Sequence, residues 1–332
     1  MLNEFRQDLV SGEWVLFATG RASRPIERVS ENRNNGQAKA ACPFENPEKF
    51  GNEVVATYLN QDQTDWMIKV AKNKFPAVLE GEMGPLKNMG PFSVYEGRGM
   101  HEVVIFRDHD RCLCDYEKED LGEIFKVYQE RYLATRDHGL RKYTLIFHNH
   151  GHRAGASIRH PHSQIISIPI LPPDVKRSLH GSEEFYKKNK KRIYDVMIDW
   201  EAEEKKRIVY ENQYFIAFCP FVSKTPYEIR IFPKESHAHF EKMPEDQLIH
   251  LGDMMGAVLR KISKGLHDPD YNFFIHTAPL GETDVDPHEF YTWHIEVIPK
   301  VSLTGAFELG SGVDVNVVDP DEAAKLLRET EI

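Results

Sequence analysis

The chain repeats its own pattern, and this repetition restricts its possible folds more than any other feature. Three blocks rich in β-branched, aromatic and histidine residues each return once, in the same order, further along the chain. The paired blocks are residues 101–121 with 227–248, 143–151 with 271–279, and 160–169 with 293–300. Chance similarity among apolar strands is the simpler explanation, but it does not account for the shared order. The order therefore favours a duplicated unit.

Each copy of the unit is predicted as two strands, a helix and two further strands. Residues 228–232 alternate polar and apolar side chains, which is typical of a strand with one buried face. Apolar residues at helical spacing occur in both copies, namely Leu121, Ile124, Phe125, Tyr128 and Leu133, and Leu248, Leu251, Met254, Met255, Val258 and Leu259. This pattern indicates an α+β fold of two repeated halves, in which helices pack against an antiparallel sheet.

A charged segment separates the two copies. Residues 173–207 have a helical pattern and many charges, so we interpret them as a solvated helical connector. The N-terminal half then spans residues 1–172, and the C-terminal half spans residues 208–332. We expect the N-terminal half to carry the reactive residues, because five histidines cluster there between positions 148 and 162.

Charge and cysteine content exclude several classes of protein. The net charge of −10 gives no electrostatic support for nucleic-acid binding. Four cysteines in 332 residues are too few and too irregularly spaced for a disulfide framework. No apolar run is long enough to span a membrane, and the first residues do not resemble a secretion signal. We therefore expect a cytoplasmic protein with neither nucleic-acid nor membrane partners.

The segment that carries chemistry is Gly-Ala-Ser-Ile-Arg-His-Pro-His-Ser-Gln at residues 155–164, which leads directly into an apolar strand. The two-residue period of a strand places His160, His162 and Gln164 on the same side. A neutral imidazole can attack an α-phosphorus, which divides one difficult displacement into two easier ones. We interpret His162 as this nucleophile, with Gln164 and Ser157 donating hydrogen bonds to phosphate oxygens. A structural turn with surface histidines would explain neither the Gly-Ser lead nor the following glutamine.

This motif resembles the galactose-1-phosphate uridylyltransferase branch of the histidine-triad superfamily, and further matches extend over most of the chain. The segment Gly-Glu-Trp at 12–14, with the arginines that follow it, is similar to the N-terminal segment of the family. The resemblance implies nucleotide or phosphate binding by Arg21, Arg24, Asn73 and Asn149. It also implies that Glu308 and Asn316, in the closing segment, lie near the sugar.

The resemblance further implies a ping-pong transfer. A nucleoside diphosphate sugar gives its nucleotide to His162 and releases a sugar 1-phosphate, and a second sugar 1-phosphate then accepts the nucleotide. The implied enzyme is a UDP-glucose–hexose-1-phosphate uridylyltransferase of galactose metabolism. Mg²⁺ is not required, because arginines and a histidine cation supply the positive charge. Members of the family commonly form homodimers.

A structural zinc ion is often held in this family by two cysteines and two histidines. Glu45 stands here where the second cysteine would be, so the implied zinc ligands are Cys42, Glu45, His109 and His160. Carboxylate is an acceptable zinc ligand; in the alternative, the site has decayed and Cys42 is a small buried residue. A second metal site of the family has lost one histidine at Thr292, which leaves His276 and His288 as possible ligands.

Three other functions stay open. The first is a nucleoside diphosphate sugar phosphorylase of the ADP-glucose type, with inorganic phosphate as acceptor. The second is a histidine-triad hydrolase, which Gln164 disfavours because glutamine cannot act as a general acid for attack by water. The third is a binding protein without catalysis, which would need no nucleophile such as His162.

Overall fold

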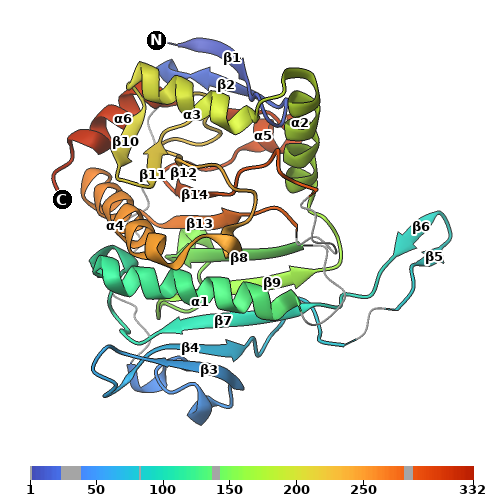
Figure 1. The fold of residues 1–332 in the computed structure, drawn as a ribbon, viewed down its shortest axis with the longest axis vertical. Coiled ribbons are helices and arrows are strands. Elements are labelled where there is room, and N and C mark those ends of the chain that lie inside the picture. Colours follow the sequence, from blue (N-terminus) through green and yellow to red (C-terminus); the bar gives the residue numbers. More distant parts are fainter. Residues whose placement is uncertain (1, 24–38, 82–83, 137–142, 280–286) are drawn as a thin grey trace.

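The computed structural model describes residues 2–23, 39–81, 84–136, 143–279 and 287–332. Its centre is a ten-stranded antiparallel sheet that runs through both halves of the chain (Figure 1). The first half supplies β3 (Val54–Leu59), β4 (Trp66–Lys72), β7 (Met100–Phe106), α1 (Lys118–Arg136), β8 (Tyr143–His150) and β9 (His162–Ile168). The second half supplies β10 (Ile208–Glu211), β11 (Phe215–Phe218), β12 (Ile229–Pro233), α4 (Leu248–Gly265), β13 (Tyr271–His276) and β14 (His294–Pro299). The predicted α+β fold with two repeated halves is confirmed.

The strand order shows the repetition directly. From one edge to the other the strands run β10-β11-β12-β14-β13-β8-β9-β7-β4-β3, so each half has the same order from its edge to the centre. Within the ten-stranded sheet, each half has three strands before its helix, not the two predicted. The additional strands are the edge strands β3 and β10, which are short and partly exposed, and so lack a clear apolar pattern.

The two halves meet where the equivalent strands β8 and β13 pair antiparallel, with Phe147 opposite Phe274. Phe147 also lies opposite Gln164, and Phe274 lies opposite Glu296. The register therefore equates Phe147 with Phe274, an offset of 127 residues (274 minus 147). The sequence comparison, which matched residue 143 to residue 271, was wrong by one position, and a shift of one residue exchanges the two faces of a strand.

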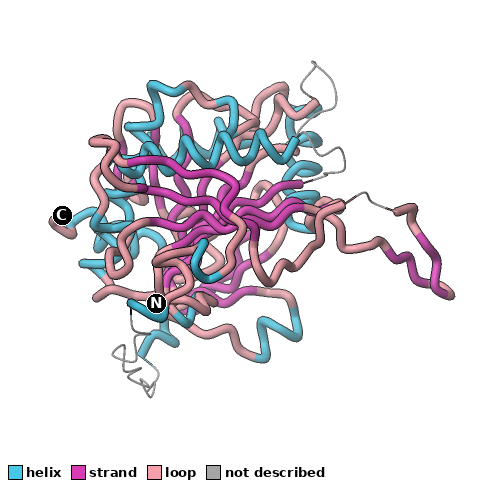
Figure 2. The backbone as a smooth tube through the Cα atoms, turned by 90° about the horizontal axis from the view of Figure 1, so that it is seen from below, coloured by secondary structure: helices cyan, strands magenta, loops and turns pink. Residues whose placement is uncertain are grey.

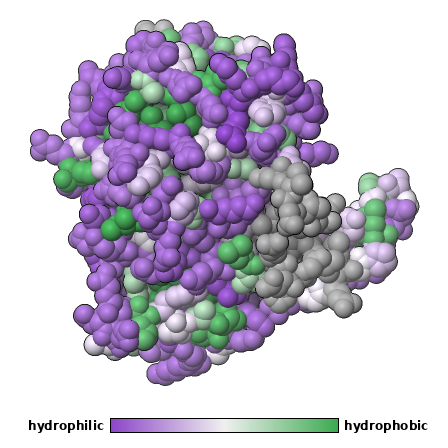
Figure 3. Space-filling model, in the orientation of Figure 1, coloured by the Kyte–Doolittle hydropathy of each residue, from purple (hydrophilic) through white to green (hydrophobic). Residues whose placement is uncertain are grey.

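Helices α1 and α4 lie side by side on one face of the sheet (Figure 1). The predicted apolar stripes of both helices are buried, except that Leu133 is 40% exposed. The two helices approach each other closely, because a Cβ atom on Gly252 would lie 2.1 Å from the carbonyl oxygen of Lys118. The surface that this side of the molecule presents to solvent is mainly hydrophilic (Figure 3). Apolar area on these helices is thus removed from water by the sheet, which stabilises the fold.

The opposite face of the sheet is covered differently in the two halves. Over the second half, α2 (Pro173–Asn189) and α3 (Ile193–Glu204) pack onto a buried cluster that contains Tyr194, Phe232 and Tyr291. Over the first half, a smaller apolar cluster contains Cys42, Phe44, Val103 and Ile105. This face is therefore covered by two helices in the second half and only by a smaller apolar cluster in the first half.

Smaller elements complete the molecule. A three-stranded sheet contains β1 (Asn3–Gln7), β2 (Trp14–Ala18) and β15 (Asp314–Asn316), and the short helices α5 (Ala306–Ser311) and α6 (Pro320–Glu329) lie near the C-terminus. The hairpin of β5 (Lys87–Met89) and β6 (Phe92–Val94) extends away from the main body (Figures 1 and 2). Within the described ranges, no helix is long and apolar enough to cross a membrane.

Candidate active site

His162, the first residue of β9, is held in one tautomer by the backbone. Its Nδ1 donates a hydrogen bond to the carbonyl oxygen of His160, at 2.8 Å, which leaves the lone pair on Nε2. The side chain is buried, and burial lowers the pKa of this imidazole. Phe44 packs against the ring at a centroid distance of 5.0 Å. The imidazole is thus neutral near pH 7, with a fixed lone pair available for attack on an electrophile.

Two side-chain amides share the sheet face of His162. Gln164 follows two residues later on β9, and Asn149 lies on the neighbouring strand β8, where Phe147 pairs with Gln164. Residues on one face of paired strands are close enough to act on one bound group. The structure therefore brings together the predicted nucleophile, Gln164 and Asn149.

Two further residues, which were not predicted from the sequence, form hydrogen bonds with these amides. His101, at the start of β7, lies with its Nε2 2.8 Å from Gln164 Oε1 and 3.1 Å from Asn73 Nδ2. Asn272 of β13 donates to Asn149 Oδ1 at 2.8 Å. Both contacts join different strands, so no spacing along the chain signals them.

The loop from Gly151 to Ser157 precedes β9 and is held against the second half. The Arg153 N–H donates to Asp270 Oδ2 at 2.7 Å. Gly151 has φ of 83°, and a Cβ atom there would lie 2.1 Å from the Asp270 carboxylate, so only glycine fits. Gly155 also has positive φ, and Ser157 is exposed on this loop. The Ser157 side chain is therefore accessible to solvent.

The four residues predicted to bind zinc converge at the side chain of His160. Possible ligand atoms of Cys42, His109 and His160 lie within 4.8 Å of one another, and the Nδ1 atoms of the two histidines are 3.1 Å apart. Glu45 Oε2 lies 3.6 Å and 3.9 Å from these nitrogens and is buried without a hydrogen-bond partner. Burial lowers the pKa of His160 to about 4, and its Nε2 donates to the Phe106 carbonyl, so the lone pair lies on Nδ1.

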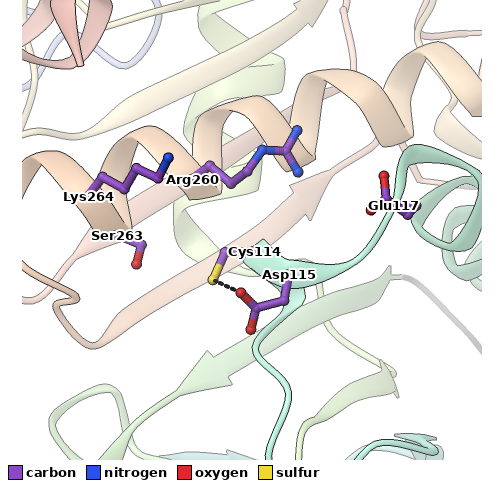
Figure 4. Close-up of a pocket in the computed structure, with 6 residues that line it drawn as sticks. All are labelled: Cys114, Asp115, Glu117, Arg260, Ser263 and Lys264. Carbon is purple, nitrogen blue, oxygen red and sulfur yellow. Dashed lines mark hydrogen bonds between the residues drawn. The ribbon is translucent and has the colours of Figure 1, made fainter. Parts of the chain in front are cut away.

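Cys112 and Cys114 are not part of this cluster. Cys112 precedes the 3-10 turn η4 (Leu113–Asp115), and Cys114 lies within the turn and enters the core beneath α1 and α4. A cavity of about 400 Å³ lies beside Cys114, and charged side chains near this turn and on α4 line it (Figure 4). The Cys114 thiol donates a hydrogen bond to the Asp115 carboxylate. None of the predicted site residues lines this cavity.

The contacts of the remaining predicted residues do not include His162. Arg21 is exposed on η1 (Thr19–Ser23), and Arg24 lies outside the described residues. Glu308 is partly buried on α5, and its carboxylate accepts from the Gly305 N–H at 3.0 Å. Asn316 is buried, and its amide donates to Ser223 and to the Thr225 carbonyl. In the described part of the chain these contacts are internal to the protein and assign no ligand.

Comparison with known proteins places this site in a family. Residues 1–172 match the N-terminal domain of galactose-1-phosphate uridyl transferase, and residues 123–330 match a domain of unknown function, DUF4921. An ADP-glucose phosphorylase of Arabidopsis thaliana is 31% identical over 99% of this chain and 93% of its own length. A galactose-1-phosphate uridylyltransferase of Thermotoga maritima is 28% identical over 99% of both chains.

A solved structure agrees with these relatives. The crystal structure of an ADP-glucose phosphorylase from Arabidopsis thaliana, with bound ADP-glucose, superposes over 100% of both chains with a TM-score of 0.85 and 29% sequence identity. Both relatives, an ADP-glucose phosphorylase and a galactose-1-phosphate uridylyltransferase, are nucleotidyl-transferring enzymes. The chain is a nucleotidyltransferase and belongs to the galactose-1-phosphate uridylyltransferase family.

Proposed function

We propose that the protein transfers a nucleoside monophosphate from a nucleoside diphosphate sugar, through a covalent intermediate on His162. The observation that carries this proposal is the hydrogen bond from His162 Nδ1 to the His160 carbonyl oxygen. It leaves Nε2 as the nucleophilic atom and stabilises the positive charge that develops on the ring.

The first step forms a bond between His162 Nε2 and the α-phosphorus. It breaks the bond from that phosphorus to the bridging oxygen, and the electron pair departs with the sugar 1-phosphate. Nδ1 keeps its proton throughout. In the second step an acceptor phosphate oxygen attacks the same phosphorus and displaces the neutral imidazole, which restores the enzyme.

The charge of the transition state needs hydrogen-bond donors around the phosphate. Gln164 and Asn149 supply amide N–H groups from the face of His162, and Ser157 supplies a hydroxyl from the adjacent loop. Arg21 and Arg24 are proposed to bind the diphosphate, Asn73 to face the nucleoside side, and Glu308 and Asn316 to face the sugar. Each donor removed from such a site typically costs about 10²–10³ in rate.

The donor we propose first is ADP-glucose, with inorganic phosphate as the acceptor. It is supported by the ADP-glucose phosphorylase relative, which is 31% identical, and by the corresponding structure with a TM-score of 0.85. The second candidate is UDP-glucose with a hexose 1-phosphate acceptor, which the match over residues 1–172 and the 28% identical uridylyltransferase support. Both reactions use the same covalent step at His162.

We also propose that Cys42, Glu45, His109 and His160 hold a zinc ion. Two facing Nδ1 atoms, a thiol and a buried carboxylate oxygen without a partner form a donor set that suits zinc. The His160 Nε2–H bonded to a carbonyl is the usual outer contact of a ligating histidine. The ion would stabilise the position of His160, whose backbone oxygen orients the nucleophile. One zinc per chain is expected by native mass spectrometry, with loss in Cys42→Ala and retention in the control Cys219→Ala.

The test of the proposed function is an intact-mass measurement. The protein is incubated with ADP-glucose or with UDP-glucose, without acceptor, and quenched without acid. A gain of one AMP or one UMP establishes the intermediate and names the base. The adduct is then exposed to inorganic phosphate or to galactose 1-phosphate, and the acceptor that discharges it distinguishes the two candidates. Free nucleoside monophosphate without an adduct, from either donor, would show a hydrolase and overturn the proposal.

A further inference from the structure

The two amides beside His162 raise a question of orientation. A side-chain amide has a donor end and an acceptor end, and only its NH₂ group can stabilise a phosphate oxygen. If Gln164 or Asn149 turned around, its carbonyl oxygen would face the phosphate and repel it. The contacts of the two amides show which end each of them has free.

For Gln164 the orientation follows from a backbone amide. The N–H of Ala77 donates to His101 Nδ1 at 3.1 Å, so Nδ1 carries the lone pair and Nε2 carries the proton of the neutral ring. Burial lowers the pKa of His101, which favours this neutral form. The Nε2–H then donates to Gln164 Oε1 at 2.8 Å, while the nearby Asn73 Nδ2 is not an acceptor. The acceptor end of Gln164 is occupied, and its NH₂ group is left for a ligand.

For Asn149 the orientation follows from a backbone carbonyl. The Ala154 carbonyl oxygen can only accept, and Asn272 Nδ2 donates to it at 2.8 Å. The second hydrogen of the same NH₂ group is directed to Asn149 Oδ1, also at 2.8 Å. The Nδ2 of Asn149 is then turned toward the loop, where a Cβ atom on Gly155 would lie 3.8 Å from it. Here too the acceptor end is occupied, and the donor end faces the loop that leads to the nucleophile.

We propose that His101 and Asn272 are positioning residues for nucleotidyl transfer. Each fixes one amide beside His162, so that Gln164 and Asn149 both present NH₂ groups to the α-phosphate before substrate binds. Asn272 belongs to β13 of the second half, so the second half contributes to a reaction whose nucleophile belongs to the first. The inference rests on the proposed function and adds two residues that do not contact the substrate.

The sharpest test compares Asn272→Asp with Asn272→Ala. Aspartate has the same shape as asparagine, but its carboxylate only accepts hydrogen bonds. Asn149 would therefore turn its NH₂ group to the aspartate and its oxygen to the phosphate, whereas alanine leaves Asn149 free to adopt either orientation. We expect the rate of adduct formation at saturating donor to fall about 100-fold for Asn272→Asp and about 10-fold for Asn272→Ala. A residue that only filled space would give the reverse order.

A double-mutant cycle tests whether the effect passes through Asn149. In an Asn149→Ala background, the two Asn272 variants should form adduct at equal rates, because there is no amide left to orient. Thermal unfolding is measured for every variant, and rates are expressed per folded protein. Asn212→Asp is the matched control, because Asn212 makes similar amide contacts to His250 and Asp253 away from the site. That control should change stability and leave the rate unchanged.

His101 gives an independent test. His101→Gln keeps an N–H donor for Gln164 Oε1, while His101→Leu removes it. We expect the glutamine variant to retain most of the wild-type rate and the leucine variant to lose about 10-fold or more, with no difference between them in a Gln164→Ala background.

The outcomes separate the two proposals. If wild-type protein takes up no nucleotide from either donor, the proposed function fails. The positioning role is overturned, while the proposed function stands, in either of two cases in which wild-type protein takes up nucleotide. In the first case the two variants at Asn272, or the two at His101, do not differ in rate in the expected order. In the second case they differ by the same factor when Asn149 or Gln164 is replaced by alanine.

Discussion

His162 and His294, the first residues of β9 and β14, occupy equivalent positions in the two halves, but their surroundings differ. In both, a histidine donates from Nδ1 to the carbonyl oxygen two residues earlier, at 2.8 Å for His162 and 3.1 Å for His294. The backbone arrangement is thus common to both copies. The difference between the two copies lies in what surrounds each imidazole.

The surroundings of His294 are filled and charged. The Phe232 ring stacks on the imidazole at a centroid distance of 4.9 Å, and the Tyr194 ring is tilted against it at 5.5 Å. Helix α3 covers this face. Glu296 takes the place of Gln164 and forms an ion pair with Arg230 at 3.0 Å. A carboxylate at this position would repel a phosphate, and the aromatic side chains exclude one. The two copies thus differ in the residue two positions after the histidine and in the helix that covers this face.

The largest expected difference between the copies concerns their histidines. His162→Gly should abolish adduct formation, with a loss of at least about 10⁴-fold, because no other described group replaces the nucleophile. His294→Asn should change the rate per folded protein less than threefold, as an order-of-magnitude estimate for a residue outside the site. Intact mass after incubation with donor measures both. Adduct formation by the His162→Gly variant would place the nucleophile elsewhere.

The next largest effect on the rate of adduct formation is expected when Gln164 is replaced by the glutamate that the second copy has at the equivalent position. Gln164→Glu places a carboxylate beside the phosphate, and we expect adduct formation to slow by about 10²–10³-fold. Gln164→Met, which has similar volume and no charge, should be less impaired. Single-turnover kinetics at saturating donor measures the rates. Equal rates for the two variants would mean that a negative charge at this position does not hinder nucleotidyl transfer.

The reverse change should affect stability and not rate. Glu296→Gln removes one carboxylate from buried Arg230, which also contacts Glu228 at 3.0 Å. We expect a loss of about 3 kcal/mol in the free energy of unfolding, since breaking a buried ion pair leaves a charge partly uncompensated. Urea unfolding measures this loss, and the adduct rate per folded protein should stay at the wild-type value. A slower rate with unchanged stability would refute a structural role for the pair.

The smallest expected effect is on the pH dependence of stability. Burial lowers the pKa of His294 to about 3, and it lowers the pKa of His162 in the same direction. An unfolded histidine titrates near 6.5, so the unfolded chain takes up protons first as the pH falls. Stability should therefore decrease below about pH 6.5, by up to about 1.4 kcal/mol per pH unit for each such histidine.

Unfolding in urea at pH 7.5, 6.0 and 5.0 checks this slope. His294→Asn should reduce it, because asparagine does not titrate. His250→Asn, a change at a half-buried histidine of α4, is the matched control. An unchanged slope in the His294 variant would contradict the assignment.

The sequence predicted the site best where the residues are neighbours in one strand. His162 and Gln164 are two residues apart in β9, so their shared face could be predicted without the fold, whereas His160 precedes the strand. The cluster around Cys42 and His109 followed from the resemblance to the family. His101 and Asn272 could not be predicted, because their partners lie on other strands and depend on the exact register. The one-residue error in matching β8 to β13 would have placed Asn272 on the wrong face.

The pairing of β8 with β13 has a consequence for the history of the molecule. Equivalent strands meet antiparallel around Phe147 and Phe274, as they would in a symmetric association of two identical chains. This geometry is the one that fusion of the two chains of a symmetric dimer would leave. The first half cannot be separated from the second without loss of the contact from Asn272 to Asn149.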